Sequence, residues 1–246
     1  MPGEEMHLLM LDVDGTLLHS NEYDADCFVR AVTATLNIPV IDKDWGSYEH
    51  VTDSGILYEL VFREYGRGPT NEEMRMVQAE FLSQLDTVLD GLDCPSVPVA
   101  GAIEFLAAID SSPAIAPSIA TGGWEAPCRR KLAKSGFSVD HIPLASSDDA
   151  MSRVAIMECS LRYAKKTYEQ QEFRSVTYIG DGSWDMKASE QLEWNFIGVG
   201  TALLSFVDPR PQHWIDDFAN REEIDQILDS LGITIGRIGL SSPQTT

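Results

Sequence analysis

Two aspartates close an apolar run near the start of the chain. The run 8–11 is Leu-Leu-Met-Leu, which is typical of a strand buried in a sheet, and Asp12 and Asp14 follow it. Side chains alternate along an extended chain, so both carboxylates point to the same side. Two negative charges held this close require a cation or a proton. An acidic turn that caps the next helix is the alternative interpretation of the same residues.

A hydroxyl and two glycines follow a second apolar run. Thr121, Gly122 and Gly123 come after the run 115–120 and precede a helical pattern. Backbone N–H groups at the start of a helix bind anions, and glycines leave those groups accessible. The segment therefore predicts an anion site, with a plain helix cap as the alternative.

A second pair of carboxylates follows a third apolar run. Asp181 and Asp185 come after the run 176–179, and glycines on both sides of Asp181 allow the backbone to turn tightly. The carboxyl ends of parallel strands share one edge of a sheet, so the polar residues after all three runs are expected to converge. Carboxylate and hydroxyl oxygens in such a group suit Mg²⁺.

One arginine stands at an informative position. Arg153 falls in the first turn of a helix predicted to begin near Ser152. The helix dipole disfavours a cation there unless an anion lies in front of it. A phosphate or carboxylate in front of Arg153 would meet that need, and a solvated surface arginine beside Asp148 and Asp149 is the alternative.

Elements that could position these residues alternate after residue 96. Such alternation is typical of a doubly wound parallel sheet with right-handed crossovers, which is an α/β fold. The pattern predicts helices over 101–109, 124–134, 152–166 and 184–191, and strands over 115–120, 176–179 and 196–199.

The segment 18–95 has a different pattern. Apolar residues recur at helical spacing, as in Phe28, Val32 and Leu36, and a longer stripe runs from Met74 to Val88. No strand is predicted there, and a proline-containing linker follows at 94–98. The sequence therefore predicts an all-helical cap over 18–95, inserted into a Rossmann-like core. The core comprises 1–17 and 96–240, and the tail 241–246 is expected to fray.

Composition narrows the possible partners. The 246 residues carry a formal charge of −21, which disfavours binding to nucleic acid or to an anionic membrane. The four cysteines have no CxxC spacing, and no apolar run has the length of a membrane span or a signal peptide. A cytoplasmic protein without nucleic acid or membrane partners is expected.

In the types of these residues and in their order along the sequence, the chain resembles the haloacid dehalogenase (HAD) superfamily. The likeness is to its phosphatase-type branch with a helical cap, which includes phosphoglycolate phosphatases and β-phosphoglucomutases. The first motif of that branch matches residues 12–16, and the second, third and fourth match Thr121, Arg153 and residues 180–185. Most relatives carry Lys where this chain has Arg153, which keeps the charge but changes the hydrogen-bonding geometry.

The resemblance implies a role for each motif. Asp12 would be the nucleophile that accepts the phosphoryl group, and Asp14 would protonate the leaving oxygen and later activate water. The residues implied to bind phosphoryl oxygens are Thr121, Gly122 and Arg153. Those implied to hold Mg²⁺ are Asp12, Asp14 through its backbone carbonyl, Asp181, and Asp185 through water.

The function implied is that of a Mg²⁺-dependent phosphatase. It would hydrolyse a small phosphorylated metabolite through an aspartyl-phosphate intermediate, as a monomer or homodimer. Asp14 disfavours a dehalogenase, since those enzymes generally lack this acid. A sugar phosphomutase of the same superfamily stays open, because it shares all four motifs. A non-catalytic phosphate-binding or regulatory protein is the other alternative, and the intact catalytic motifs argue against it.

Overall fold

The sheet has six parallel strands. The computed structural model describes residues 6–91, 96–200 and 211–235, and within them the strand order is β3-β2-β1-β4-β5-β6. Because β2, β1 and β4 are neighbours, their carboxyl ends lie side by side. The strands are β1 (His7–Leu11), β2 (Ile115–Ala120), β3 (Leu144–Ala145), β4 (Val176–Gly180), β5 (Asn195–Val199) and β6 (His213–Ile215).

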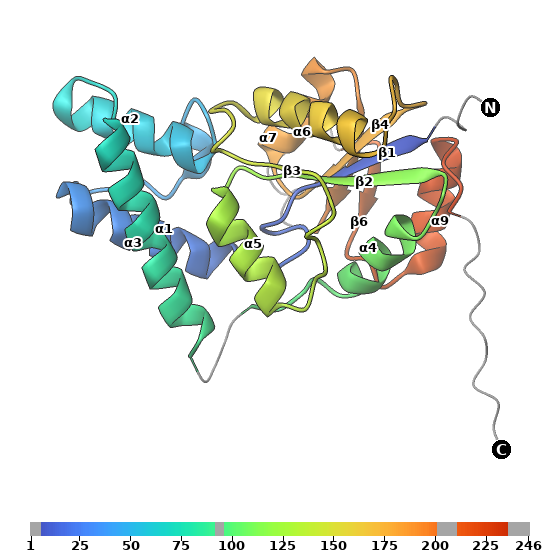
Figure 1. The fold of residues 1–246 in the computed structure, drawn as a ribbon, viewed down its shortest axis with the longest axis horizontal. Coiled ribbons are helices and arrows are strands. Elements are labelled where there is room, and N and C mark those ends of the chain that lie inside the picture. The colour runs from blue at the N-terminus through green and yellow to red at the C-terminus, as the bar shows by residue number, and fades with distance from the viewer. Residues whose placement is uncertain (1–5, 92–95, 201–210, 236–246) are drawn as a thin grey trace.

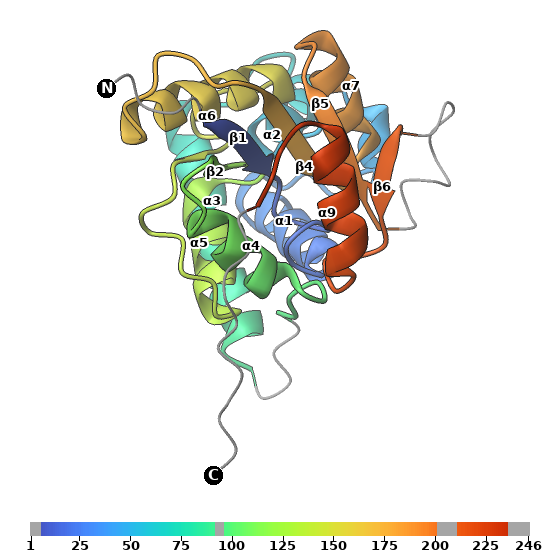
Figure 2. The ribbon, with the colours of Figure 1, turned by 90° about the vertical axis from the view of Figure 1, so that its right-hand side faces the viewer.

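Helices cover both faces of this sheet, so the predicted doubly wound α/β fold is confirmed (Figures 1 and 2). None of the helices in the described ranges combines the length and the apolar character needed to cross a bilayer. The helices are α1 (Asn21–Leu36), the 3₁₀ turn η1 (Trp45–Ser47), α2 (Asp53–Tyr65), α3 (Asn71–Leu89), α4 (Ala102–Asp110), α5 (Glu125–Lys134), α6 (Arg153–Thr167), α7 (Ser183–Gln191) and α9 (Arg221–Ser230).

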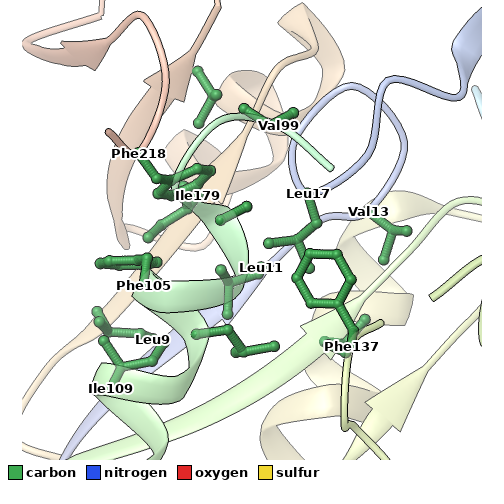
Figure 3. Packing of buried hydrophobic residues seen from close by; sticks show 14 of the residues in the cluster. Leu9, Leu11, Val13, Leu17, Val99, Phe105, Ile109, Phe137, Ile179 and Phe218 are labelled. Carbon is green, nitrogen blue, oxygen red and sulfur yellow. The ribbon is translucent and has the colours of Figure 1, made fainter. Parts of the chain in front are cut away.

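The central strand β1 is buried on both faces. Leu9 and Leu11 belong to the apolar cluster that includes residues of α4, α5 and α9, and Figure 3 shows both near Phe105 of α4. Leu8 and Met10 belong to the opposite cluster, with residues of α6 and α7. Alternation along the strand therefore divides its side chains between two apolar layers, which anchors the chain just before Asp12.

A helical insert lies between β1 and α4, and its described residues are 18–91. It contains α1, η1, α2 and α3, and Figure 1 groups its three α-helices at the left of the sheet. Its apolar cluster includes Phe28, Phe81 and Leu85, and Trp124, which directly precedes α5, joins them. The end of the predicted cap at 92–95 and the tail 241–246 lie outside the described residues.

Some elements differ from the sequence-based expectations. The strands β3 and β6 were not predicted, because a strand of two or three residues is too short to show periodicity. The helix α9 was not predicted either, although its buried residues Ile224 and Leu228 have helical spacing. In α3 the buried stripe is Val77, Phe81, Leu85 and Leu89, whereas Met74 and Val88 are only partly buried. The buried residues of α3 therefore recur every four residues as far as Leu89.

Candidate active site

A cavity of about 180 Å³ lies between the carboxyl ends of the central strands and the helical insert. It is a concave site at the strand ends of an open α/β sheet, where ligands bind in this architecture. Asp185 alone among the predicted site residues does not line it. The predicted residues that do line it are Asp12, Asp14, Thr121, Gly122, Arg153 and Asp181.

Asp12 and Arg153 form a buried ion pair beside the cavity. The Asp12 side chain is 5% exposed, and Arg153 Nη1 donates to Asp12 Oδ1 at 3.1 Å. Arg153 Nε lies 3.2 Å from Asp185 Oδ1. The first turn of α6 thus has two carboxylates in front of its arginine, as the dipole argument required. Burial and the charge of Asp185 raise the pKa of Asp12 well above its ordinary value.

Three carboxylates could hold one metal ion. Asp12, Asp181 and Asp185 each offer an oxygen atom, and these oxygens lie within 4.8 Å of one another. Burial and the charge of Asp185 raise the pKa of Asp181 to about 7. The cluster therefore has more negative charge than Arg153 compensates, and an all-oxygen donor set suits a hard divalent cation such as Mg²⁺.

Gly15 allows the first and fourth motifs to approach each other. Its φ is +82°, and a Cβ at this position would lie 1.9 Å from Asp181 Oδ2. The same carboxylate oxygen accepts a hydrogen bond from Asn21 Nδ2 at 3.2 Å. Any larger residue at position 15 would displace Asp181, so the glycine is required by the close packing of the cluster.

The segment after β2 lies against Arg153. Thr121 is 1% exposed, and its Oγ1 accepts from the backbone N–H of Gly123 at 3.1 Å. A Cβ on Gly122 would lie 2.6 Å from Arg153 Nη2, so only glycine lets the backbone approach the guanidinium this closely. The hydroxyl, the backbone and the guanidinium meet at one side of the cavity, an arrangement that can bind an anion.

Lys131 is a site residue that the sequence analysis missed. Its side chain is 1% exposed, and its ammonium contacts Oδ1 of Asp14 and Oδ1 of Asp24. Burial disfavours the charged form, but the two carboxylates raise the pKa of Lys131 well above its ordinary value. The available signal was its place on α5, three residues after Cys128 and next to Leu132, which are both buried.

The helical insert adds a second carboxylate to the cavity, at a half-buried position. Asp53, at the start of α2, lines the cavity and accepts from the backbone N–H of Trp124 at 2.9 Å. Burial and the charge of Asp24 raise the pKa of Asp53 well above its ordinary value. Trp124 Nε1 donates to Ser54 Oγ at 2.9 Å, so the beginning of α2 is held against the beginning of α5.

Comparison with solved structures identifies the fold. A hydrolase from Pseudomonas syringae superposes with a TM-score of 0.68 at 18% identity, covering 91% of this chain and 99% of its own. A putative beta-phosphoglucomutase from Bacteroides vulgatus gives 0.65 at 16% identity, with 93% and 91% covered. A HAD hydrolase of family IA, variant 3, from Entamoeba histolytica gives 0.61 at 16% identity, with 90% and 99% covered. No protein-family model and no curated protein matches the sequence. The chain therefore has the fold of the haloacid dehalogenase-like hydrolases.

Proposed function

We propose that the protein is a Mg²⁺-dependent phosphatase that hydrolyses a small phosphorylated metabolite through an aspartyl-phosphate on Asp12. The observation that carries this proposal is the buried pairing of Asp12 with Arg153 at the wall of the cavity. A carboxylate can attack a phosphate dianion only where positive charge offsets the repulsion between them. Arg153 and a cation held by Asp12, Asp181 and Asp185 would provide that charge.

The chemistry needs two displacements at phosphorus. An Asp12 carboxylate oxygen forms a bond to phosphorus while the ester P–O bond breaks, and Asp14 gives a proton to the leaving oxygen, which departs as the alcohol. Asp14 then takes a proton from water as the water oxygen attacks phosphorus, and the Asp12–phosphorus bond breaks to release phosphate. Thr121, Gly122 and Arg153 would hold the phosphoryl oxygens throughout. Mg²⁺ would supply charge neutralisation when bound at the carboxylate cluster.

We propose further that the helical insert acts as a cap, with the predicted bounds 18–95. Phe28, Trp45 and Ile56 give its side of the cavity an apolar surface. The backbone N–H of Asp53 donates to the carbonyl of Gly122 at 2.8 Å, so the insert reaches the segment expected to bind phosphate. The leaving group of a substrate held at Asp12 would therefore contact the insert, and this surface would select among phosphate esters.

The charge of that surface disfavours a second acidic group on the substrate. Asp24 and Asp53 line the cavity from the insert, and no lysine or arginine of its described residues does so. The cations of the insert lie elsewhere: Arg63 pairs with Glu59, for example, and Arg67 with Glu73. We therefore infer that the natural leaving group is neutral or positively charged. This inference also disfavours a phosphomutase that requires a sugar bisphosphate.

A matched pair of esters tests this inference. The value of kcat/KM for 2-hydroxyethyl phosphate is expected to exceed that for 2-phosphoglycolate by about 10-fold, which corresponds to ~1.4 kcal/mol of differential transition-state binding. Asp53→Asn should narrow the gap at a pH above the raised pKa of Asp53, where the wild-type carboxylate is ionised and repels the substrate. Equal values for the two esters in the wild-type enzyme would contradict the inference.

Release of inorganic phosphate tests the proposed activity itself. The protein should hydrolyse p-nitrophenyl phosphate and a subset of phosphorylated metabolites in the presence of Mg²⁺. A phosphomutase would instead convert a sugar phosphate into its isomer with little free phosphate. Stabilisation of the protein by these esters without any turnover would favour the non-catalytic binding protein.

Asp14→Asn should slow the enzyme in a way that depends on the leaving group. Asparagine cannot donate the proton, so kcat is expected to fall by about 10²- to 10⁴-fold for an alkyl phosphate. The loss should be smaller for p-nitrophenyl phosphate, whose leaving group is stable without protonation. Single-turnover measurement of phosphoenzyme formation checks this, and equal losses for both esters would remove Asp14 from the acid role.

A further inference from the structure

Lys131 is a buried residue next to the cavity. It is contributed by α5, does not itself line the cavity, and lies with its side chain 1% exposed. Buried lysines are rare unless they are paired, and Lys131 contacts one oxygen each of Asp14 and Asp24. An apolar residue of similar volume often serves stability as well as a buried ion pair does. Stability alone is therefore a weak explanation for a lysine here.

The contacts to Asp14 are arranged asymmetrically. Lys131 Nζ and Ser20 Oγ both donate to Oδ1 of Asp14, and Ser20 is fully buried. The other oxygen, Oδ2, lies 3.7 Å from the position that a Cβ on Gly123 would occupy, and Gly123 lines the cavity. Two donors on one oxygen hold the carboxylate against rotation, which leaves Oδ2 at the wall of the cavity.

The same ammonium joins the two parts of the site. Asp24 belongs to α1 of the helical insert, whereas Asp14 follows the central strand of the sheet. Lys131 therefore relates the orientation of Asp14 to the position of the insert that lines the other side of the cavity. A side chain in this place can set the geometry of a reaction without touching the substrate.

We propose that Lys131 is a positioning residue, which together with Ser20 fixes Oδ1 of Asp14 so that Oδ2 faces the leaving oxygen of the substrate. The proposal rests on the proposed function, in which Asp14 exchanges protons with the leaving group and with water. It assigns to Lys131 no direct contact with the phosphate ester. Its effect on turnover must therefore pass through Asp14.

A double-mutant cycle on turnover tests that dependence. Lys131→Met is expected to lower kcat for an alkyl phosphate by about 10- to 10²-fold, with KM changed by less than about twofold, because a misplaced catalytic group costs rate rather than binding. In the Asp14→Asn background the same substitution should change kcat by less than about twofold, since the group that Lys131 positions is already disabled. A merely structural role would lower kcat equally in both backgrounds.

Two further variants keep the test decisive. Lys134→Met is the matched control, because Lys134 lies one turn along α5, is 37% exposed and pairs with Asp90, away from the cavity; it should leave kcat unchanged. Ser20→Ala removes the second donor to Oδ1 without burying an uncompensated charge, so it serves if Lys131→Met does not fold. It should lower kcat by about threefold in wild type and not in the Asp14→Asn background.

The outcomes separate the two proposals. Equal loss in both backgrounds, for Lys131→Met or Ser20→Ala, overturns the positioning role and leaves the phosphatase assignment intact. Absence of turnover in the wild-type enzyme, with Mg²⁺ and a broad panel of esters, overturns both.

Discussion

Asp12→Asn is expected to abolish phosphate release from every ester, together with the covalent phosphoenzyme. The carboxamide is a poor nucleophile, and the neighbouring carboxylates are poorly placed to replace Asp12, because Asp185 does not line the cavity and Asp14 is held by Lys131. Without the nucleophile no covalent intermediate can form, so the residual rate of phosphate release should fall below detection. Acid quenching after mixing with ³²P-labelled substrate measures the phosphoenzyme directly.

The fold should survive this substitution. Burial and the charge of Asp185 raise the pKa of Asp12, so its ionised form is disfavoured where it stands, and a neutral amide removes that cost. Arg153 loses its pair with Asp12 but keeps the contact with Asp185, so its buried charge stays compensated. Thermal unfolding of the variant should therefore remain cooperative. Asp216→Asn, at an exposed position, is the matched control and should keep full activity. A phosphoenzyme formed by Asp12→Asn would show that the nucleophile is another residue.

Removal of divalent metal is expected to have an equally large effect. EDTA should abolish turnover and added Mg²⁺ should restore it, because the clustered carboxylates of Asp12, Asp181 and Asp185 otherwise repel a phosphate dianion. Asp181→Asn should raise the Mg²⁺ concentration needed for half-maximal activity. Full turnover in chelator would contradict the assignment.

Metal binding also has a readout that does not depend on activity. The pKa of Asp181 is about 7 in the folded chain, above the ordinary value of 3.8, so the folded state binds more protons than the unfolded state between these values. The contribution of Asp181 to stability is therefore present below about pH 4 and is lost as the pH rises to about 7.

Mg²⁺ should raise the melting temperature more at pH 8 than at pH 6, because protons compete for the same oxygens. Asp181→Asn should largely remove the stabilisation by Mg²⁺.

The sequence alone determined the main architecture and the placement of the predicted motifs. Apolar runs of four to six residues predict buried strands, and their alternation with helical patterns predicts the parallel sheet. The strands before Asp12, Thr121 and Asp181 prove to be neighbours, so the side chains that follow them meet at one edge. This could be predicted because position after a strand end is a property of the linear chain.

Only the tertiary structure decided which charged side chains lie at the cavity and directly next to it. Lys131 lies in a run of three basic residues on α5, and Asp24 and Asp53 resemble ordinary acids in the first turns of helices. Their contacts join residues more than 70 positions apart, such as Asp53 with Trp124 and Lys131 with Asp14. Periodicity reports which face of one helix is apolar, but not which side chains of two packed elements meet. The burial of Lys131 and the acidic character of the insert side of the cavity depend on how the helical insert packs against the start of α5.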